Sequence, residues 1–413
     1  MNRSLLSIAL VAVGLSITGT ATAESGDWLS GDYLTGDWNG NRARLEEEGY
    51  RFFAYYNSII SSNISGGIQS GSDIAGDLFA GMTVDLGKAL NLDGWTFNLT
   101  GIHRDGRSID KDVGGIYSVM QLVGGQTYFL YNVSLEKTWA DDKYAFKFGR
   151  ITATDDFAGS PFYGYYLSNS IDGQIRAVLF DGVMTSYPFA VWGARFKYAP
   201  NDDFRIKIGA YQLTENMWDP EEHGTDFAFR DSDGWSLMTQ LEWDWSLDGK
   251  PGHFNLGMNN VSFDMPNFNS ADVTDTFIRY YTQYDQMVTR ETSGSEQGLY
   301  VFGTLAYTDQ QEAALVPLQV SLGAQYVGPF EGRPKDRLIF GTTYGKLSKD
   351  YADEQVALGN GRPDYEWIFE LGYRVQFTKF AYAQPDVQMV KQPGGTGEIP
   401  DATVLGVQFG VTF

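Results

Sequence analysis

The chain has 413 residues and a formal net charge of -22, with 30 Lys and Arg against 52 Asp and Glu. It has no cysteine, which excludes disulfides, thiolate metal sites and cysteine nucleophiles, and its 3 histidines leave little for metal or triad chemistry. The acidic balance repels phosphate, so nucleic acid is excluded as a partner.

Aromatic residues make up 15% of the chain and glycine contributes 48 residues, yet the mean hydropathy is only -0.27. Aromatic side chains are therefore mixed with polar ones along most of the sequence. Such a mixture suits a sheet with one apolar and one wet face. It is the first indication of a β-barrel in a membrane.

The amino terminus has the features of a secretory signal peptide. Arg3 supplies a positive charge, residues 5–17 are apolar, and Ala21-Thr22-Ala23 is a small-x-small cleavage site. The apolar stretch is short of the roughly 20 residues that a spanning helix needs. We predict a signal peptide over 1–23, the alternative being an ordinary buried first helix.

An N-terminal segment over 24–49 is predicted to hold one short helix, 42–48, which ends before Gly49. From Tyr50 to Phe413 the pattern alternates with period two between turn-forming clusters, which predicts an antiparallel transmembrane barrel. A barrel with both ends in the periplasm needs an even number of strands. Fifteen segments are clear and a sixteenth is placed at 277–287. The fifteen are 50–61, 74–86, 95–104, 125–138, 143–151, 187–198, 203–213, 234–246, 252–263, 298–308, 315–327, 337–347, 364–378, 379–391 and 403–413.

The last strand shows the alternation most clearly, because Leu405, Val407, Phe409 and Phe413 share one face. On neighbouring strands the opposite face is charged and bulky, which predicts a water-filled lumen with lipid outside.

The longest connection, 152–186, is rich in aromatic residues and is predicted to fold into the lumen. Its aromatic residues are Phe157, Phe162, Tyr163, Tyr165, Tyr166 and Phe180.

Several segments carry a family likeness. The chain resembles the carbohydrate-selective porins of the OprB family, from Gram-negative outer membranes. The matching segments are 36–42 (GDWNGNR), 62–67 (SNISGG), 101–108 (GIHRDGRS), 148–150 (FGR), 326–336 (YVGPFEGRPKD), 364–386 and 404–413. The resemblance implies a sixteen-stranded barrel that admits glucose and other sugars by facilitated diffusion, and a homotrimer.

Arg104 and Glu136 have the parity of lumen-facing residues on adjacent strands, with Phe129 and Tyr131 predicted on the lipid side of the second strand. We expect Arg104 to donate to vicinal hydroxyls while Glu136 accepts from them and holds the guanidinium in place. Asp105 and Arg107 follow at the rim. Together these residues are our hypothesis for the sugar constriction. The alternative is that their charges only hydrate a wide lumen or pair with each other.

Three further residues are predicted in the path. Glu370 and Arg374 lie four apart on one strand face, about 13 Å, so each is expected to meet a neighbouring strand. Arg150 is ambiguous, since alternation places it with the lipid face whereas the resemblance favours the lumen. Other cations on polar faces could form a basic ladder, namely Arg195, Lys197, Arg205 and Lys207.

The predicted function is a passive, sugar-preferring outer-membrane channel without cofactor or metal. A general or ion-selective porin is the close alternative. An outer-membrane hydrolase is disfavoured, because His103 has no accompanying serine motif. The expected partners are carbohydrates, outer-membrane lipid and lipopolysaccharide, and the barrel assembly machinery through the strand that ends in Phe413.

Overall fold

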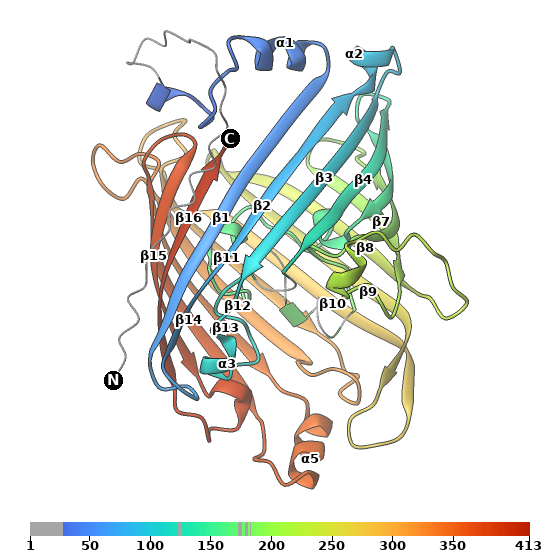
Figure 1. Ribbon diagram of the computed structural model, residues 1–413, viewed down its shortest axis with the longest axis vertical. Helices are drawn as coiled ribbons and strands as arrows, with labels where there is room; N and C mark the ends of the chain where they lie inside the picture. The colour runs from blue at the N-terminus through green and yellow to red at the C-terminus, as the bar shows by residue number, and fades with distance from the viewer. Residues whose placement is uncertain (1–27, 123–125, 172–175, 178–180, 182) are drawn as a thin grey trace.

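Sixteen antiparallel strands close into one barrel within the described part of the computed structural model, and β1 pairs with β16 to complete the ring (Figure 1). The structure describes residues 28–122, 126–171, 176–177, 181 and 183–413. The predicted signal peptide, 1–23, lies outside the described residues. No helix in the described residues is long and apolar enough to cross a membrane.

The predicted strands are all present, including the sixteenth, which is β10. The boundaries differ by at most four residues, and at β6 the strand begins at Val191 rather than at 187, so Tyr187 belongs to the preceding loop. The strands are β1 (Tyr50–Ser65), β2 (Gly71–Asp85), β3 (Trp95–Gly106), β4 (Tyr128–Trp139), β5 (Tyr144–Ile151), β6 (Val191–Tyr198), β7 (Phe204–Leu213), β8 (Gly234–Leu247), β9 (Lys250–Pro266), β10 (Val273–Met287), β11 (Gly298–Tyr307), β12 (Leu318–Val327), β13 (Arg337–Lys346), β14 (Tyr365–Gln376), β15 (Ala381–Lys391) and β16 (Ala402–Thr412).

The predicted N-terminal helix is α1 (Asn41–Glu47), which lies beside the start of β1. The other helices sit in connections, where short turns leave little periodicity to read. They are α2 (Leu86–Leu90), α3 (Asp110–Val113), α5 (Lys349–Ala357) and the 3-10 turns η1 (Trp28–Ser30), η2 (Ala153–Asp155), η3 (Tyr163–Tyr165), η4 (Pro220–Glu222) and η5 (Pro393–Gly395). The C-terminus, α1 and α2 lie at one end of the barrel, and α3 and α5 lie at the other (Figure 1).

Apolar side chains are exposed on the outside of the barrel while polar ones are buried inside, the reverse of a soluble protein. On β8, Trp243 is 57% exposed whereas the adjacent Glu242 is 7% exposed. On β16, Phe409 is 43% exposed and Gln408 is buried. An exposed apolar wall of this kind requires lipid around it, so the predicted orientation of the strand faces is confirmed.

One stretch of β4 departs from the predicted alternation. The pairing of β3 with β4 shifts so that Gly101 faces Leu130 directly after Thr100 faces Asn132, which leaves Tyr131 as an extra residue. Such a bulge reverses the faces of the residues before it. Phe129 and Tyr131 therefore face the lumen, and their predicted position on the lipid side is wrong.

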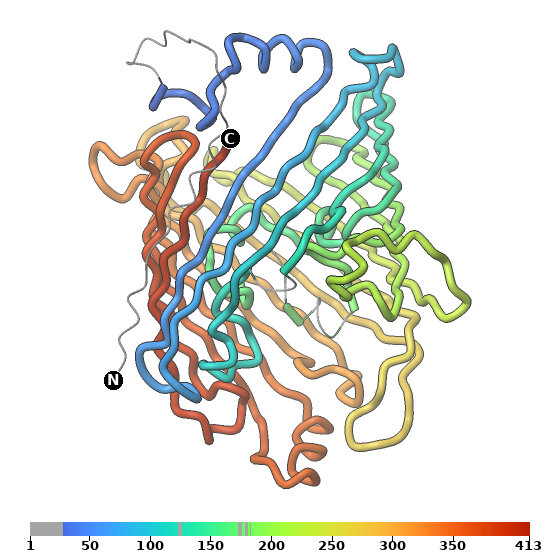
Figure 2. Tube along the Cα trace, viewed as in Figure 1, coloured from blue at the N-terminus to red at the C-terminus, as the bar shows by residue number. Residues whose placement is uncertain are grey.

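The described residues of the connection between β5 and β6, which are 152–171, 176–177, 181 and 183–190, run inside the barrel, as predicted; we name them the lumen loop (Figure 2). Phe157, Phe162, Tyr163 and Tyr166 are all buried, and each packs with side chains that strands of the wall contribute. Phe180 lies outside the described residues. Because its aromatic rings would be exposed in water, the loop is more stable inside the barrel than extended from it.

Leu322, in the middle of β12, is 55% exposed on the outer wall and offers a test of the lipid face. An arginine near the bilayer midplane costs about 2–4 kcal/mol. Leu322→Arg should lower the denaturant midpoint of the barrel folded in lipid vesicles and reduce its folded yield, whereas Leu322→Val should change both little. Equal midpoints for the two variants would contradict the assigned orientation.

Candidate functional site in the barrel lumen

The lumen loop is held against β14 by hydrogen bonds and by a cation–π contact. Glu370 accepts from the backbone N–H of Leu167 at 2.5 Å and of Ser168 at 3.0 Å. Arg374 donates to the carbonyl oxygen of Gly164 at 3.1 Å. Its guanidinium lies 4.3 Å from the ring centre of Tyr165. These contacts hold the tip of the loop on one side of the lumen.

A second anchor joins the loop to β10 and to the connection after β11. Asp181 pairs with Arg279 at 3.1 Å and accepts from the backbone N–H of Val316 at 2.6 Å. Arg279 also donates to the carbonyl oxygen of Val316 at 2.8 Å, and its side chain is fully buried. Breaking one partner of a buried pair leaves an uncompensated charge, so this anchor resists opening.

Asp156 connects the loop to the opposite wall, where three cations converge on it. Lys147 of β5 approaches its carboxylate at 2.6 Å and Arg195 of β6 at 3.1 Å, while Lys207 of β7 donates to its carbonyl oxygen. Burial alone would raise the pKa of Asp156, but the positive charges of Lys147 and Arg195 outweigh burial and hold the pKa below its ordinary value. This anchor is therefore charged at neutral pH and weakens only as the pH falls through that lowered pKa.

The charges continue along the inner wall as a paired network. Glu136 accepts from Arg195 at 2.8 Å, Lys207 pairs with Glu242 at 2.6 Å, and Arg205 pairs with both Glu242 and Asp244 at 2.7 Å. The predicted basic ladder is therefore not a row of free cations, since three of its four members are ion-paired. The network joins the cations Lys147, Arg195, Arg205 and Lys207 to the carboxylates of Glu136, Asp156, Glu242 and Asp244, with no net charge.

Aromatic rings form a column beside the lumen loop. Tyr55 of β1 stacks on Phe79 of β2 with ring centres 4.4 Å apart, and Phe79 stacks on Tyr187 of the loop at 4.9 Å. Tyr131 meets Phe79 and Tyr187 edge-on at 5.9 and 5.6 Å. All four rings are partly exposed, so the column presents apolar faces to the lumen. We name Tyr55, Phe79, Tyr131 and Tyr187 the aromatic column.

Arg104 lies at one end of this column. Its guanidinium is 4.8 Å from the ring centre of Tyr187, and the Tyr187 hydroxyl donates to Asp77 at 2.5 Å. Asp77 faces Arg104 across β2 and β3 and also accepts from Asn57 at 3.2 Å. Both Nη groups of Arg104 are buried without a hydrogen-bond partner among the described residues. The guanidinium is therefore held mainly by the charge of Asp77 and by the face of the Tyr187 ring.

The predicted partnership between Arg104 and Glu136 is wrong. Glu136 faces Thr96, which is eight residues before Arg104 and so about 26 Å away at about 3.3 Å per residue. The alternation of side chains predicted that both residues face the lumen, but it does not give their positions along the barrel axis. Asp105 and Arg107 are exposed at the end of β3, and the Arg107 N–H donates to the Ile74 carbonyl oxygen at 2.8 Å.

Arg150 retains the alternation of β5, since it faces Val133 and Trp192 in an unbroken register. It therefore shares the outer face with Phe146 and Phe148, but the connection between β7 and β8 covers it. Its guanidinium donates to the carbonyl oxygens of Ala190 at 2.6 Å and Gly224 at 3.1 Å. This position is outside the lumen, so the lumen role favoured by the family likeness does not hold for Arg150.

Glu370 and Arg374 do face the lumen, and the structure gives both a partner in the loop. Arg374 also reaches Gln384 of β15 at 2.7 Å and Gln408 of β16 at 3.4 Å, so it meets neighbouring strands as predicted. Glu370 instead bonds the loop backbone, a contact that its own strand pattern could not reveal.

The comparisons with known proteins agree with this geometry. The family model of the carbohydrate-selective porins, OprB family, matches residues 69–413. The chain belongs to the OprB family. It is a carbohydrate-selective diffusion porin of the Gram-negative outer membrane and not an enzyme.

Individual members of this family are distant in sequence. Porin B of Pseudomonas aeruginosa is 28% identical over 419 residues, which cover 91% of this chain and 90% of the relative. QuiX, a candidate porin of Acinetobacter baylyi, is 25% identical over 408 residues, which cover 91% of this chain and 92% of the relative. The high-pH structure of OprB from Pseudomonas putida is 22% identical and superposes with a TM-score of 0.89 over 93% of this chain and 99% of that chain. That last likeness shows the fold.

Sequence reasoning missed the aromatic column and the Asp156 anchor. Tyr55 and Phe79 have lumen parity on their strands, so the period-two pattern could have indicated them. Tyr187 was placed in a strand, and Asp156 follows β5 in the loop without any motif. Neither residue carries a local signal, because each acquires its partners only when the loop folds inward.

Loss of the Glu370 anchor should loosen the loop. Glu370→Ala removes the acceptor of two backbone N–H groups, and each such bond contributes about 1 kcal/mol. We expect larger and noisier single-channel currents in planar bilayers, because the loop tip can then move away from β14. Glu398→Ala, at an exposed position on the connection between β15 and β16, is the matched control. Currents identical to the parent protein would show that Glu370 does not anchor the loop.

Proposed function

We propose that neutral sugars such as glucose cross the lumen past the exposed edges of the aromatic column, which joins the lumen loop to strands β1, β2 and β4. The observation that carries this proposal is the pairing of lumen charges into a neutral network next to partly exposed rings. Pyranose C–H faces pack on aromatic rings, and hydroxyl groups exchange hydrogen bonds with side chains at the edges of those rings. A lumen of this kind favours an uncharged, hydroxyl-rich solute over an ion.

Arg104 and Asp77 have a supporting role in this proposal. Asp77 holds the Tyr187 hydroxyl, and Arg104 faces the Tyr187 ring, so together they fix the ring that ends the column. A sugar contacts the exposed edges of the column rather than the buried guanidinium of Arg104. Each contact contributes about 0.5–1.5 kcal/mol, which keeps binding weak enough for the sugar to leave again.

The alternative is a general or ion-selective porin. Ion selectivity requires a ring of uncompensated charge in the lumen. Arg195, Lys207 and Glu242 are ion-paired, so this part of the inner wall carries no ring of uncompensated charge. Comparing sugar block of the ion current with the reversal potential in a salt gradient separates the two functions in one planar-bilayer experiment.

The proposal extends to export and assembly. Residues 1–23 direct export, and the strand that ends in Phe413 engages the barrel assembly machinery. Outer-membrane lipid and lipopolysaccharide surround the apolar wall, and the porin assembles as a homotrimer. The family resemblance supports the trimer, and the exposed aromatic wall supports the lipid contact.

The Tyr187 ring tests the column directly. Tyr187→Ala removes the stacking partner of Phe79 and should weaken sugar block about two- to tenfold, which corresponds to the loss of about 0.5–1.5 kcal/mol. Tyr187→Phe keeps the ring and removes only its bond to Asp77, so a smaller loss is expected. Titrating glucose against ion current through purified protein measures both. Unchanged block in Tyr187→Ala would place sugar binding elsewhere.

Removing the Arg104 charge should change ion preference as well. Arg104→Ala leaves Asp77 without its cross-strand cation, so the reversal potential in a salt gradient should shift toward cation preference and sugar block should weaken. Arg107→Ala removes the same charge at the exposed end of β3 and should shift the potential less. Equal shifts in the two variants would contradict a specific role for Arg104.

A further inference from the structure

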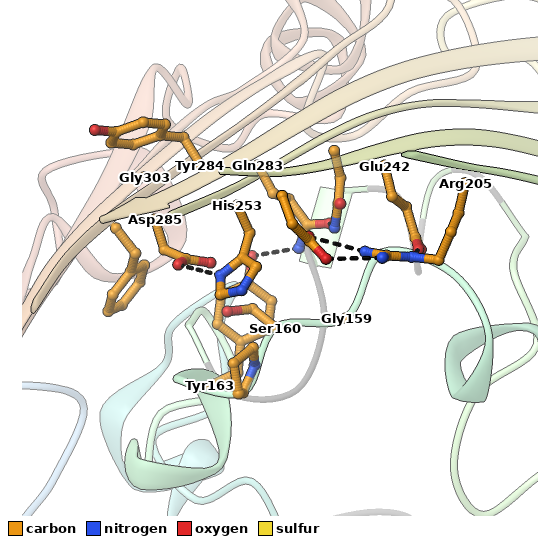
Figure 3. Close-up of a pocket in the computed structure, with 14 residues that line it drawn as sticks. Gly159, Ser160, Tyr163, Arg205, Glu242, His253, Gln283, Tyr284, Asp285 and Gly303 are labelled. Atoms are coloured by element: carbon orange, nitrogen blue, oxygen red, sulfur yellow. Dashed lines mark hydrogen bonds and ion pairs between the residues drawn. The ribbon is translucent and has the colours of Figure 1, made fainter. Parts of the chain in front are cut away.

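A polar cavity of about 180 Å³ lies between the lumen loop and the strands of the wall (Figure 3). Residues 159–161 and Tyr163 of the loop form one side, and the inner faces of β7 to β11 form the other. Arg205, Asp244 and His253 all lie within a few residues of the strand ends that share the C-terminal end of the barrel. The cavity therefore opens toward the periplasm.

Two ion pairs hold the rim of this cavity in a fixed geometry. Arg205 binds Asp244 through both terminal nitrogens, at 2.7 and 2.8 Å, and this planar fork sits against the cavity. His253 approaches Asp285 through Nδ1 at 2.6 Å. The bidentate contact between Arg205 and Asp244 fixes the orientation of both side chains. A ligand beside them therefore meets donors and acceptors in a defined geometry.

The inner part of the cavity is tied to the lumen loop. Gln283 donates to the Ala158 carbonyl oxygen at 2.9 Å and to the Tyr163 hydroxyl at 2.6 Å, and it accepts from Asn255 at 3.2 Å. The ring of Phe302 packs edge-on against Tyr163 at 6.0 Å and lines the cavity. Polar amides thus lie beside one aromatic surface.

The rim side chains are held in place but only partly covered. The side chains of His253, Asp244 and Arg205 are 42%, 32% and 26% exposed. Nδ1 of His253 is bonded to Asp285, whereas Nε2 of this cavity-lining ring has no hydrogen-bond partner among the described residues. Donors and acceptors therefore remain for a ligand after the internal pairs have formed.

The charges of the rim decide the class of ligand. The carboxylates of Glu242, Asp244 and Asp285 disfavour an anion, and the first two are ion-paired with Lys207 and Arg205. Asp285 is hydrogen-bonded to His253, so the rim has no cluster of unpaired carboxylates that would hold a cation. What remains is a set of fixed acceptors and donors at the edge of an aromatic surface. Vicinal hydroxyl groups match such a set, because each both donates and accepts.

We propose that this cavity is a second binding subsite for a neutral pyranose sugar, on the periplasmic side of the lumen loop. The inference rests on the proposed function and adds a site at which the sugar is held again before it leaves. Two weak sites in series lower the barrier between entry and release without trapping the solute at either one. Asn255 and His253 supply the contacts that a hydroxyl group can reach.

The test is sugar block of single channels in planar bilayers, with glucose added to one side at a time. His253→Ala removes one or two hydrogen bonds, and block by periplasmic glucose should weaken about two- to tenfold. Block by external glucose should change less, because glucose from that side meets the lumen loop before it reaches the cavity. Asn255→Ala should act in the same direction, and Asn260→Ala, on the outer face of the same strand, is the matched control.

The outcomes separate this inference from the function on which it rests. If the parent protein shows sugar block that Tyr187→Ala weakens, while His253→Ala and Asn255→Ala leave periplasmic block unchanged, the second subsite is overturned and the column stands. If the parent protein shows no block from either side, the proposed function itself fails. Heat-dependent migration of the folded barrel checks each variant for folding, and Asn255→Ala decides if His253→Ala does not fold.

Discussion

Closure of the sheet is the constraint on which the rest of the structure depends. In lipid, a backbone N–H or C=O without a partner costs several kcal/mol, so a membrane sheet cannot leave an open edge. The pairing of β1 with β16, from Tyr55 opposite Thr412 to Ser65 opposite Thr403, removes that edge. The N-terminal segment supports the same seam, since Arg42 donates to the carbonyl oxygens of Phe52 and Phe413 at 3.3 and 3.2 Å.

Closure also assigns an environment to every side chain. Once the ring is complete, alternate residues must face either lipid or lumen, and a lumen this wide has to be filled or hydrated. The lumen loop takes up much of that space. Its backbone would lack partners inside a barrel, and acceptors of the wall such as Glu370 and Gln319 supply them. The barrel wall therefore determines the position of the loop, and the loop in turn narrows the lumen.

The location of charge within the molecule explains how so acidic a chain can form a sugar channel. Its formal charge is -22, yet the cations of β5 to β7 are matched with carboxylates inside the lumen. Paired charges orient hydroxyl groups without attracting counterions strongly, and the neighbouring aromatic rings add apolar contact. An ion-pair network without net charge, beside aromatic rings, is the physical basis that we propose for preferring carbohydrates over ions.

The sequence by itself determined the barrel, the number of strands, the lipid face and the inward folding of the loop. Each of these follows from period-two alternation, as in β16, or from an aromatic content whose exposure to water is unfavourable. The tertiary structure alone decided the partners. Alternation gives the face of Arg104 and Glu136 but not their height, so their separation came from strand register. The bulge that turns Tyr131 inward, the cover over Arg150 and the meeting of Tyr187 with Phe79 all join segments distant in sequence, and no local pattern encodes such contacts.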